Sequence, residues 1–144
     1  MNTEETKSTP ETAAPSKGLV LLLDDDKFLL DMYAMKFVQQ GFTVEAFLSA
    51  DQAIAALKGG LTPDAILFDI AMPERDGFSF LQAVIEGKIA EKSLKVALTN
   101  QSSDQENVKF KELGADEYWV KATMIPSEVV NKISELIAKH RGKS

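Results

Sequence analysis

The sequence predicts an α/β fold in which a parallel β-sheet is covered by helices on both faces. Short continuous apolar runs, which are typical of strands buried on both faces, recur along the chain. Segments with apolar residues at helical spacing lie between these runs, so that five predicted strands alternate with five predicted helices. This alternation favours a doubly wound sheet with right-handed crossovers.

The first predicted strand and helix follow Gly18. The strand covers residues 19–23, a run of Leu and Val only. Gly41 is placed to end the helix that follows, because glycine readily adopts the backbone conformation found just after a helix. Five residues recur at helical spacing and are expected on the buried face of this helix: Leu30, Tyr33, Ala34, Phe37 and Val38.

Two capping-box patterns mark the starts of later helices. Ser49 is followed by Gln52 and Ser103 by Glu106, and in this pattern each side chain accepts a hydrogen bond from the other residue's backbone N–H. The remaining elements are, in chain order, a strand over 43–47, a helix from Ser49 to about Lys58, a strand over 65–68, a helix over 78–85, a strand over 95–98, a helix from Ser103 to near Gly114, a strand over 117–120 and a helix with Val129, Val130, Ile133, Leu136 and Ile137 on its apolar side.

Composition limits what the chain can be. Residues 1–17 predict a disordered N-terminal tail, because after Met1 they contain no large apolar side chain, and residues 18–144 are long enough for one domain with its own core. The chain has no cysteine, which excludes disulfides and thiolate metal sites. A net charge of −6 argues against nucleic-acid binding, and the apolar runs fall short of a membrane span or a signal peptide. A cytoplasmic location is expected.

Polar residues follow four of the predicted strands. Asp24 and Asp25 come after the first strand, Asp69 after the third, Thr99 after the fourth and Lys121 after the fifth. In open doubly wound sheets the ligand site lies beyond the carboxyl ends of the strands, so these side chains should meet. Three neighbouring carboxylates repel one another, and a hard divalent cation such as Mg²⁺ relieves the repulsion. A carboxylate can also accept a phosphoryl group, which needs mainly positioning and neutralised charge.

With these residues in place, the chain resembles the receiver domain of two-component response regulators, in particular the stand-alone kind found in chemotaxis. The resemblance extends from Leu19 to about Ile137. It implies a flavodoxin-like sheet with strand order 2-1-3-4-5. Four motifs carry it, each at a predicted strand end: Leu21-Leu22-Leu23-Asp24-Asp25-Asp26, Asp69-Ile70-Ala71-Met72-Pro73-Glu74-Arg75-Asp76-Gly77, Ala97-Leu98-Thr99 and Gly114-Ala115-Asp116-Glu117-Tyr118-Trp119-Val120-Lys121.

The resemblance implies a metal site around the phospho-acceptor Asp69. Asp69 and Asp25 would bind Mg²⁺ directly, with Mn²⁺ as a possible substitute, and Asp24 would hold the ion through water. The backbone carbonyl of Ala71 would be a further ligand. Nothing in the residues themselves assigns Ala71 this role.

The resemblance also implies a switch. Lys121 would pair with Asp69 or its phosphate, Thr99 would reach the phosphate after transfer, and Tyr118 would turn inward with Thr99. A histidine kinase or a histidine phosphotransfer protein would supply the phosphoryl group, and a protein target would respond to it. The chain would be no enzyme toward other substrates, catalysing only its own phosphorylation and dephosphorylation. It is expected as a monomer or weak dimer without nucleic-acid or membrane partners.

Two positions depart from the family pattern. Ala122 replaces the usual proline after the lysine, and Asn100 replaces the usual small residue after the threonine. The family's lysine–proline bond is commonly cis, but a cis bond before alanine costs about 2.5–4 kcal/mol, so we predict a trans bond between Lys121 and Ala122. Asn100 is expected to narrow access to the acceptor.

Other interpretations of the same residues stay open. The acids at 24–26 could cap the first predicted helix, and Tyr118 could simply pack on the sheet. The whole chain could be an unphosphorylated pseudo-receiver that acts as a protein-interaction module. A phosphatase with an aspartate nucleophile ranks last, because Ala71 stands where such an enzyme needs a second acid.

Overall fold

A computed structural model describes residues 16–101 and 103–142. It contains a five-stranded parallel sheet in the order β2-β1-β3-β4-β5, which confirms the predicted fold class and strand order. Within these residues no helix has the length and apolar character needed to cross a bilayer. The elements, in chain order, are β1 (Leu19–Leu23), α1 (Lys27–Gln39), β2 (Thr43–Phe47), α2 (Ala50–Lys58), β3 (Ala65–Asp69), α3 (Gly77–Glu86), β4 (Leu94–Thr99), α4 (Asp104–Leu113), β5 (Glu117–Val120), a short 3-10 helix η2 (Lys121–Thr123) and α5 (Pro126–Gly142).

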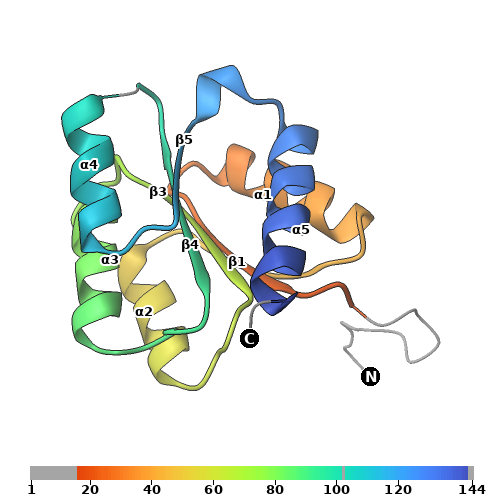
Figure 1. The fold of residues 1–144 in the computed structure, drawn as a ribbon, viewed down its shortest axis with the longest axis horizontal. Helices are drawn as coiled ribbons and strands as arrows, with labels where there is room; N and C mark the ends of the chain where they lie inside the picture. The colour runs from red at the N-terminus through yellow and green to blue at the C-terminus, as the bar shows by residue number, and fades with distance from the viewer. Residues whose placement is uncertain (1–15, 102, 143–144) are drawn as a thin grey trace.

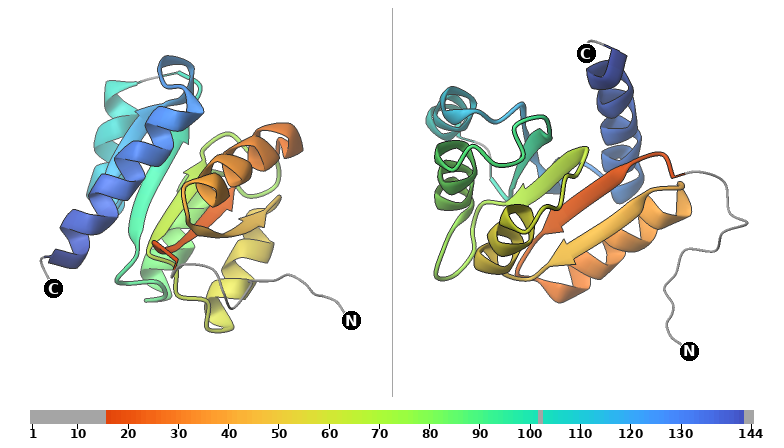
Figure 2. Two further views of the ribbon diagram at one scale, coloured as in Figure 1. Left: turned by 90° about the vertical axis from the view of Figure 1, so that its right-hand side faces the viewer. Right: turned by 90° about the horizontal axis from the view of Figure 1, so that it is seen from below.

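The helices cover both faces of the sheet. Helices α1 and α5 pack on one face, and α2, α3 and α4 pack on the other (Figures 1 and 2). The strands supply both cores because successive side chains point to opposite faces. In β1, for example, Val20 and Leu22 contact the α1–α5 side, whereas Leu21 and Leu23 contact the other side. The central strands are therefore mostly apolar, as the sequence predicted, with Lys95 and the strand-end residues Asp69 and Thr99 as polar exceptions.

Side-chain caps fix where the helices begin. The hydroxyl of Ser49 accepts a hydrogen bond from Gln52 N, and that of Ser103 accepts one from Glu106 N, so both predicted helix starts are confirmed. Asp26 and Asp76 cap α1 and α3 in the same way. These caps place the first turns of α1, α3 and α4 beside the carboxyl ends of β1, β3 and β4.

Val38 was predicted on the buried face of α1, and this is wrong. Its side chain is 59% exposed, whereas Leu30, Tyr33 and Phe37 are buried. Successive helical residues are separated by about 100° around the axis, so Val38 points away from the side on which Phe37 enters the core. Helix α1 thus buries one large residue per turn, a narrower stripe than the spacing of its apolar residues suggested.

The predicted N-terminal tail lies outside the described residues apart from Ser16 and Lys17. Lys17 N donates to Gly41 O at 3.0 Å, and the hydroxyl of Thr43 donates to that of Ser16, also at 3.0 Å. These two residues therefore contact the start of β2.

Candidate functional site

Three carboxylates gather at the carboxyl ends of β1 and β3. Asp24, Asp25 and Asp69, hereafter the acidic cluster, each place one oxygen within 4.8 Å of the others. Asp24 and Asp69 are only 4% and 3% exposed, whereas Asp25 is open to solvent. The meeting predicted from the strand ends is therefore present, and the exposed edge of the cluster is the side from which a ligand can enter.

Lys121 bridges two members of the acidic cluster. Its Nζ lies 2.9 Å from Asp24 Oδ2 and 2.9 Å from Asp69 Oδ1. Burial alone would lower the pKa of Lys121, but the hydrogen bonds and charges of the two aspartates outweigh it and raise the pKa. The Lys121 side chain is therefore positively charged and almost fully buried. It compensates only part of the negative charge around it.

Asp69 shares Lys121 with Asp24, so its charge is only partly compensated. Burial raises its pKa to about 6, Lys121 opposes this rise, and the neighbouring Asp24 charge adds to it. Asp69 Oδ1 is buried, and within the described residues its close polar contact is the ion pair with Lys121 Nζ. A buried carboxylate oxygen whose one polar contact is this lysine, set beside two further carboxylates, fits a hard divalent cation such as Mg²⁺.

The raised pKa of Asp69 predicts a pH-dependent stability in metal-free buffer. Since the pKa rises from 3.8 to about 6 on folding, the unfolded chain loses its proton first, and stability falls as pH rises through this window. We expect Asp69→Asn to raise the free energy of unfolding by up to about 3 kcal/mol near pH 8 and by little near pH 4. Urea denaturation with a chelator at both pH values measures this, and an equal effect at both would contradict it.

The aspartates at 24, 25 and 26 have three different roles. Asp24 is held at both oxygens, since Oδ1 accepts from Asp26 N at 2.9 Å and Oδ2 accepts from Lys121. Asp26 caps α1 through Phe28 N and Leu29 N. Asp25 has neither hydrogen bond nor salt bridge within the described part of the chain, so its carboxylate is available to an incoming ligand. The capping interpretation holds for Asp26 and leaves the other two in the cluster.

Gly77 lets the first turn of α3 approach the backbone of the acceptor. Gly77 N donates to Ile70 O at 2.8 Å, which closes the loop after Asp69. A Cβ atom at position 77 would lie 2.5 Å from Asp69 O and 2.7 Å from Ile70 Cα. Both neighbours are backbone atoms and cannot rotate away. Glycine is therefore required here for steric reasons, because a side chain would collide with the backbone of Asp69.

Gly77→Ala should destabilise the fold by about 1–3 kcal/mol, as overpacking of a close contact does. It should also shift the backbone resonances of Asp69 and Ile70. The control is Gly59→Ala, because Gly59 ends α2 with φ −78° and a Cβ atom added there would lie no closer than 3.3 Å to its neighbours. We expect the control to stay within about 0.5 kcal/mol of the parent in urea denaturation. Equal losses in both variants would show that the approach at Gly77 is not special.

The two predicted switch residues lie on the paired strands β4 and β5, with Thr99 opposite Val120 and Tyr118 opposite Ala97. The hydroxyl of Thr99 donates to Gln101 O at 2.9 Å, and no hydrogen bond joins it to Asp69 within the described residues. The hydroxyl of Tyr118 donates to Glu106 Oε1 at 2.6 Å. Burial and the bond to Glu106 raise the pKa of Tyr118, while the Ser103 backbone and the Thr99 hydroxyl act against this rise. The tyrosine oxygen therefore binds Glu106, and Ser103 and Thr99 affect its pKa.

The positions that depart from the family pattern lie around the site. No cis peptide bond occurs in the described residues, so the predicted trans bond between Lys121 and Ala122 is confirmed. The chain passes from β5 directly into η2, and Lys121 still reaches Asp69. Asn100 and Ala71 are exposed in the loops after β4 and β3. The roles assigned to these two residues remain predictions.

Two neighbours of the site had no predicted role. Tyr33 of α1 was expected only as a core residue. Burial raises the pKa of its hydroxyl group, the charge of Lys121 lowers this pKa, and the charge of Asp24 raises it. Glu106 was expected to complete a capping box, but its carboxylate binds Tyr118. The capping motif singled out Glu106, although no local pattern could reveal a partner 12 residues away.

Comparison with known proteins agrees with this geometry. The sequence model of the response regulator receiver domain matches residues 20–134. Over 120 residues the chain is 28% identical to the response regulator SaeR of Staphylococcus aureus strain USA300, which covers 83% of this chain and 50% of SaeR. The chain thus spans about half the length of the curated relatives it matches.

Solved structures show the same arrangement of strands and helices. A CheY-like receiver domain protein from Methanospirillum hungatei JF-1 superposes with a TM-score of 0.80 at 24% identity, covering 91% of this chain and all of that one. The chemotaxis response regulator CheY4 of Vibrio cholerae superposes with a TM-score of 0.73 at 25% identity, covering 86% of this chain and 99% of its own.

Proposed function

The chain belongs to the response regulator receiver domain family, and on that premise we propose that it accepts a phosphoryl group on Asp69 in a Mg²⁺-dependent reaction. One observation carries the proposal: the buried Asp69 lies 2.9 Å from Lys121 and beside two further carboxylates, those of Asp24 and Asp25. This is the arrangement that phosphoryl transfer to a carboxylate requires, because the charge of the transferred group must be neutralised where it develops.

The reaction exchanges one bond to phosphorus for another. A carboxylate oxygen of Asp69 attacks the phosphorus of a phosphohistidine, the new O–P bond forms as the P–N bond breaks, and the departing imidazole keeps the electron pair and takes up a proton. Asp69 must be ionised to attack, and its pKa of about 6 leaves it mostly ionised at neutral pH. Attack of water on the acyl phosphate later restores the carboxylate.

The surrounding residues would bind the metal ion and position the reacting groups. Asp25, Asp69 and the Ala71 carbonyl would hold Mg²⁺, or Mn²⁺ in its place, with Asp24 acting through water. The bound ion supplies charge neutralisation at the phosphoryl oxygens. Lys121 keeps Asp69 aligned and then pairs with the phosphoryl group.

The outcome of phosphorylation is a change of partner. A histidine kinase or a histidine phosphotransfer protein donates the phosphoryl group, Thr99 and Tyr118 respond to it, and a downstream protein binds the altered surface. We place the protein in the cytoplasm and assign it no activity toward other substrates.

A second candidate is a pseudo-receiver that binds a partner without being phosphorylated. Ala122 and Asn100, which replace residues usual in the family, are the observations that favour it. The presence of the complete acidic cluster and of Lys121 argues against this candidate.

Intact-mass spectrometry separates the two candidates. The full chain is incubated with a small acyl phosphate and either Mg²⁺ or a chelator. The receiver function predicts one added phosphoryl group with Mg²⁺ and none with the chelator. An unmodified chain under both conditions would support the pseudo-receiver, and rapid release of inorganic phosphate from many substrates would point to a phosphatase.

A further inference from the structure

The contact between Tyr118 and Glu106 ties the end of the sheet to the start of α4. Tyr118 lies in β5, and Glu106 lies in the first turn of α4. The hydroxyl donates to the carboxylate at 2.6 Å, which is the short distance typical of a hydrogen bond to a charged acceptor. Such bonds are stronger than those between neutral groups, so this one helps to hold the Tyr118 side chain in its position.

The Glu106 carboxylate makes this contact and does not complete the predicted capping box. In a complete capping box its carboxylate would accept from Ser103 N, yet in the part of the chain that the structure describes only the half in which Glu106 N donates to Ser103 Oγ, at 3.2 Å, is formed, and the carboxylate binds Tyr118. The Ser103 backbone instead acts on the tyrosine oxygen and opposes the rise of its pKa. The Tyr118 hydroxyl therefore lies at the first turn of α4.

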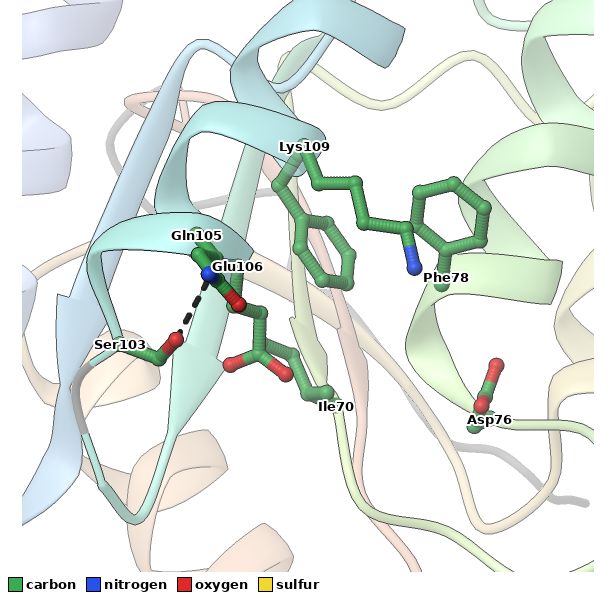
Figure 3. A pocket seen from close by; sticks show the side chains of 8 residues that line it. Ile70, Asp76, Phe78, Ser103, Gln105, Glu106 and Lys109 are labelled. Atoms are coloured by element: carbon green, nitrogen blue, oxygen red, sulfur yellow. Dashed lines mark hydrogen bonds between the residues drawn. The ribbon is translucent and has the colours of Figure 1, made fainter.

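Close packing does not explain the position of the Glu106 carboxylate. Glu106 lines a surface pocket of about 270 Å³ between α3 and α4 (Figure 3). Other residues that line this pocket include Ile70, Phe78 and Phe110. Ile70 directly follows Asp69. The carboxylate has free space on one side, so the hydrogen bond to Tyr118 is what fixes it, and it can move if the tyrosine leaves.

We propose that Glu106 is a positioning residue of the switch, whose bond to Tyr118 holds the resting state and breaks when Asp69 is phosphorylated. The proposal rests on the proposed function, because it needs Thr99 and Tyr118 to respond to the phosphoryl group. Thr99 lies on the strand paired with that of Tyr118, and its hydroxyl affects the pKa of Tyr118, so movement of that hydroxyl toward Asp69 changes the surroundings of the tyrosine. Phosphorylation then releases the first turn of α4 from β5, and α4 becomes the part of the surface that reports the state of Asp69.

The test measures affinity for beryllofluoride, a phosphoryl analogue, at constant Mg²⁺. If the bond exists only in the resting state, Glu106→Ala removes a contact that opposes loading, and affinity should rise about fivefold. Tyr118→Phe should give a similar rise, and the double variant should gain no more than either single variant. Glu106→Gln keeps an acceptor oxygen without the charge, so its gain should be smaller.

The matched control is Asp104→Ala. Asp104 is the other acid in the first turn of α4, so its removal has a similar effect on the helix dipole but does not touch Tyr118. Its affinity should equal that of the parent. Unchanged affinity in Glu106→Ala and Tyr118→Phe, or additive gains in the double variant, would overturn the proposal. Failure of the parent chain to bind beryllofluoride at all would instead count against the proposed phosphorylation of Asp69.

Discussion

Replacing Lys121 with methionine is expected to slow phosphorylation of Asp69 by about two orders of magnitude. The substitution keeps a long apolar stem but removes the positive charge that lies 2.9 Å from Asp69, and losing one such preorganised group typically costs about 10²–10³ in rate. Without Lys121 the acidic cluster is left with three uncompensated carboxylates, so the metal-free protein should also unfold at lower temperature. Added Mg²⁺ should recover part of that loss, because the cation takes over the neutralisation.

Lys95→Met is the matched control for this prediction. Lys95 is a second buried lysine, at the opposite end of the sheet, where its Nζ donates to Ser93 O at 2.8 Å and burial lowers its pKa. Its replacement can alter stability but should leave the phosphorylation rate unchanged. Rates are followed by intact mass with a small acyl phosphate at saturating Mg²⁺. Equal slowing in both variants would mean that Lys121 acts only through the stability of the fold.

Asp25→Asn should lower the affinity for Mg²⁺ by at least about 10–100-fold. Replacing even an outer partner of a metal site has effects of that size, and Asp25 is the exposed member of the acidic cluster with no other partner in the described structure. The fold should persist, since removing one of three mutually repelling charges relieves strain. Isothermal titration with Mg²⁺ gives the affinity, and phosphorylation should fall in parallel.

Asp26→Asn provides the adjacent control. Asp26 caps α1, and asparagine caps helices about as well as aspartate, so the fold should be unaffected. Because the Asp26 carboxylate already accepts from two backbone N–H groups of α1, we expect its replacement to leave Mg²⁺ affinity close to that of the parent. An equal loss of affinity in both variants would indicate that Mg²⁺ senses the general charge of this loop and that Asp25 is no specific ligand.

Much of the fold and the outline of the site could be predicted because both depend on local pattern. Continuous apolar runs define β1 and β3, and parallel strands end at one edge, so the residues after them had to meet. That rule brings Asp24, Asp69 and Lys121 to one edge of the sheet, whereas the strand order and the pairing of Lys121 with Asp69 were implied by the family resemblance. Serine caps fixed the starts of α2 and α4 for the same reason, since a cap involves residues only three apart.

What could not be predicted depends on contacts distant in sequence. The pairing of Glu106 with Tyr118 requires the packing of α4 on β5, and the local capping motif indicated a different partner. The steric need for Gly77 appears only when α3 lies against the backbone of Asp69. The exposure of Val38 reflects how narrow the contact of α1 with the sheet is, which its apolar spacing does not reveal.

The most direct test of the central claim is to locate the phosphoryl group. The chain is treated with Mg²⁺ and a small acyl phosphate. The aspartyl phosphate that forms on the protein is trapped by borohydride reduction, and the modified residue is identified by peptide mass spectrometry. We expect a single modified position, Asp69, and no modification in Asp69→Asn, which keeps the size of the side chain and can still accept a hydrogen bond from Lys121. A phosphoryl group on Asp24 or Asp25, or one that persists in Asp69→Asn, would contradict the assignment of Asp69 as the acceptor.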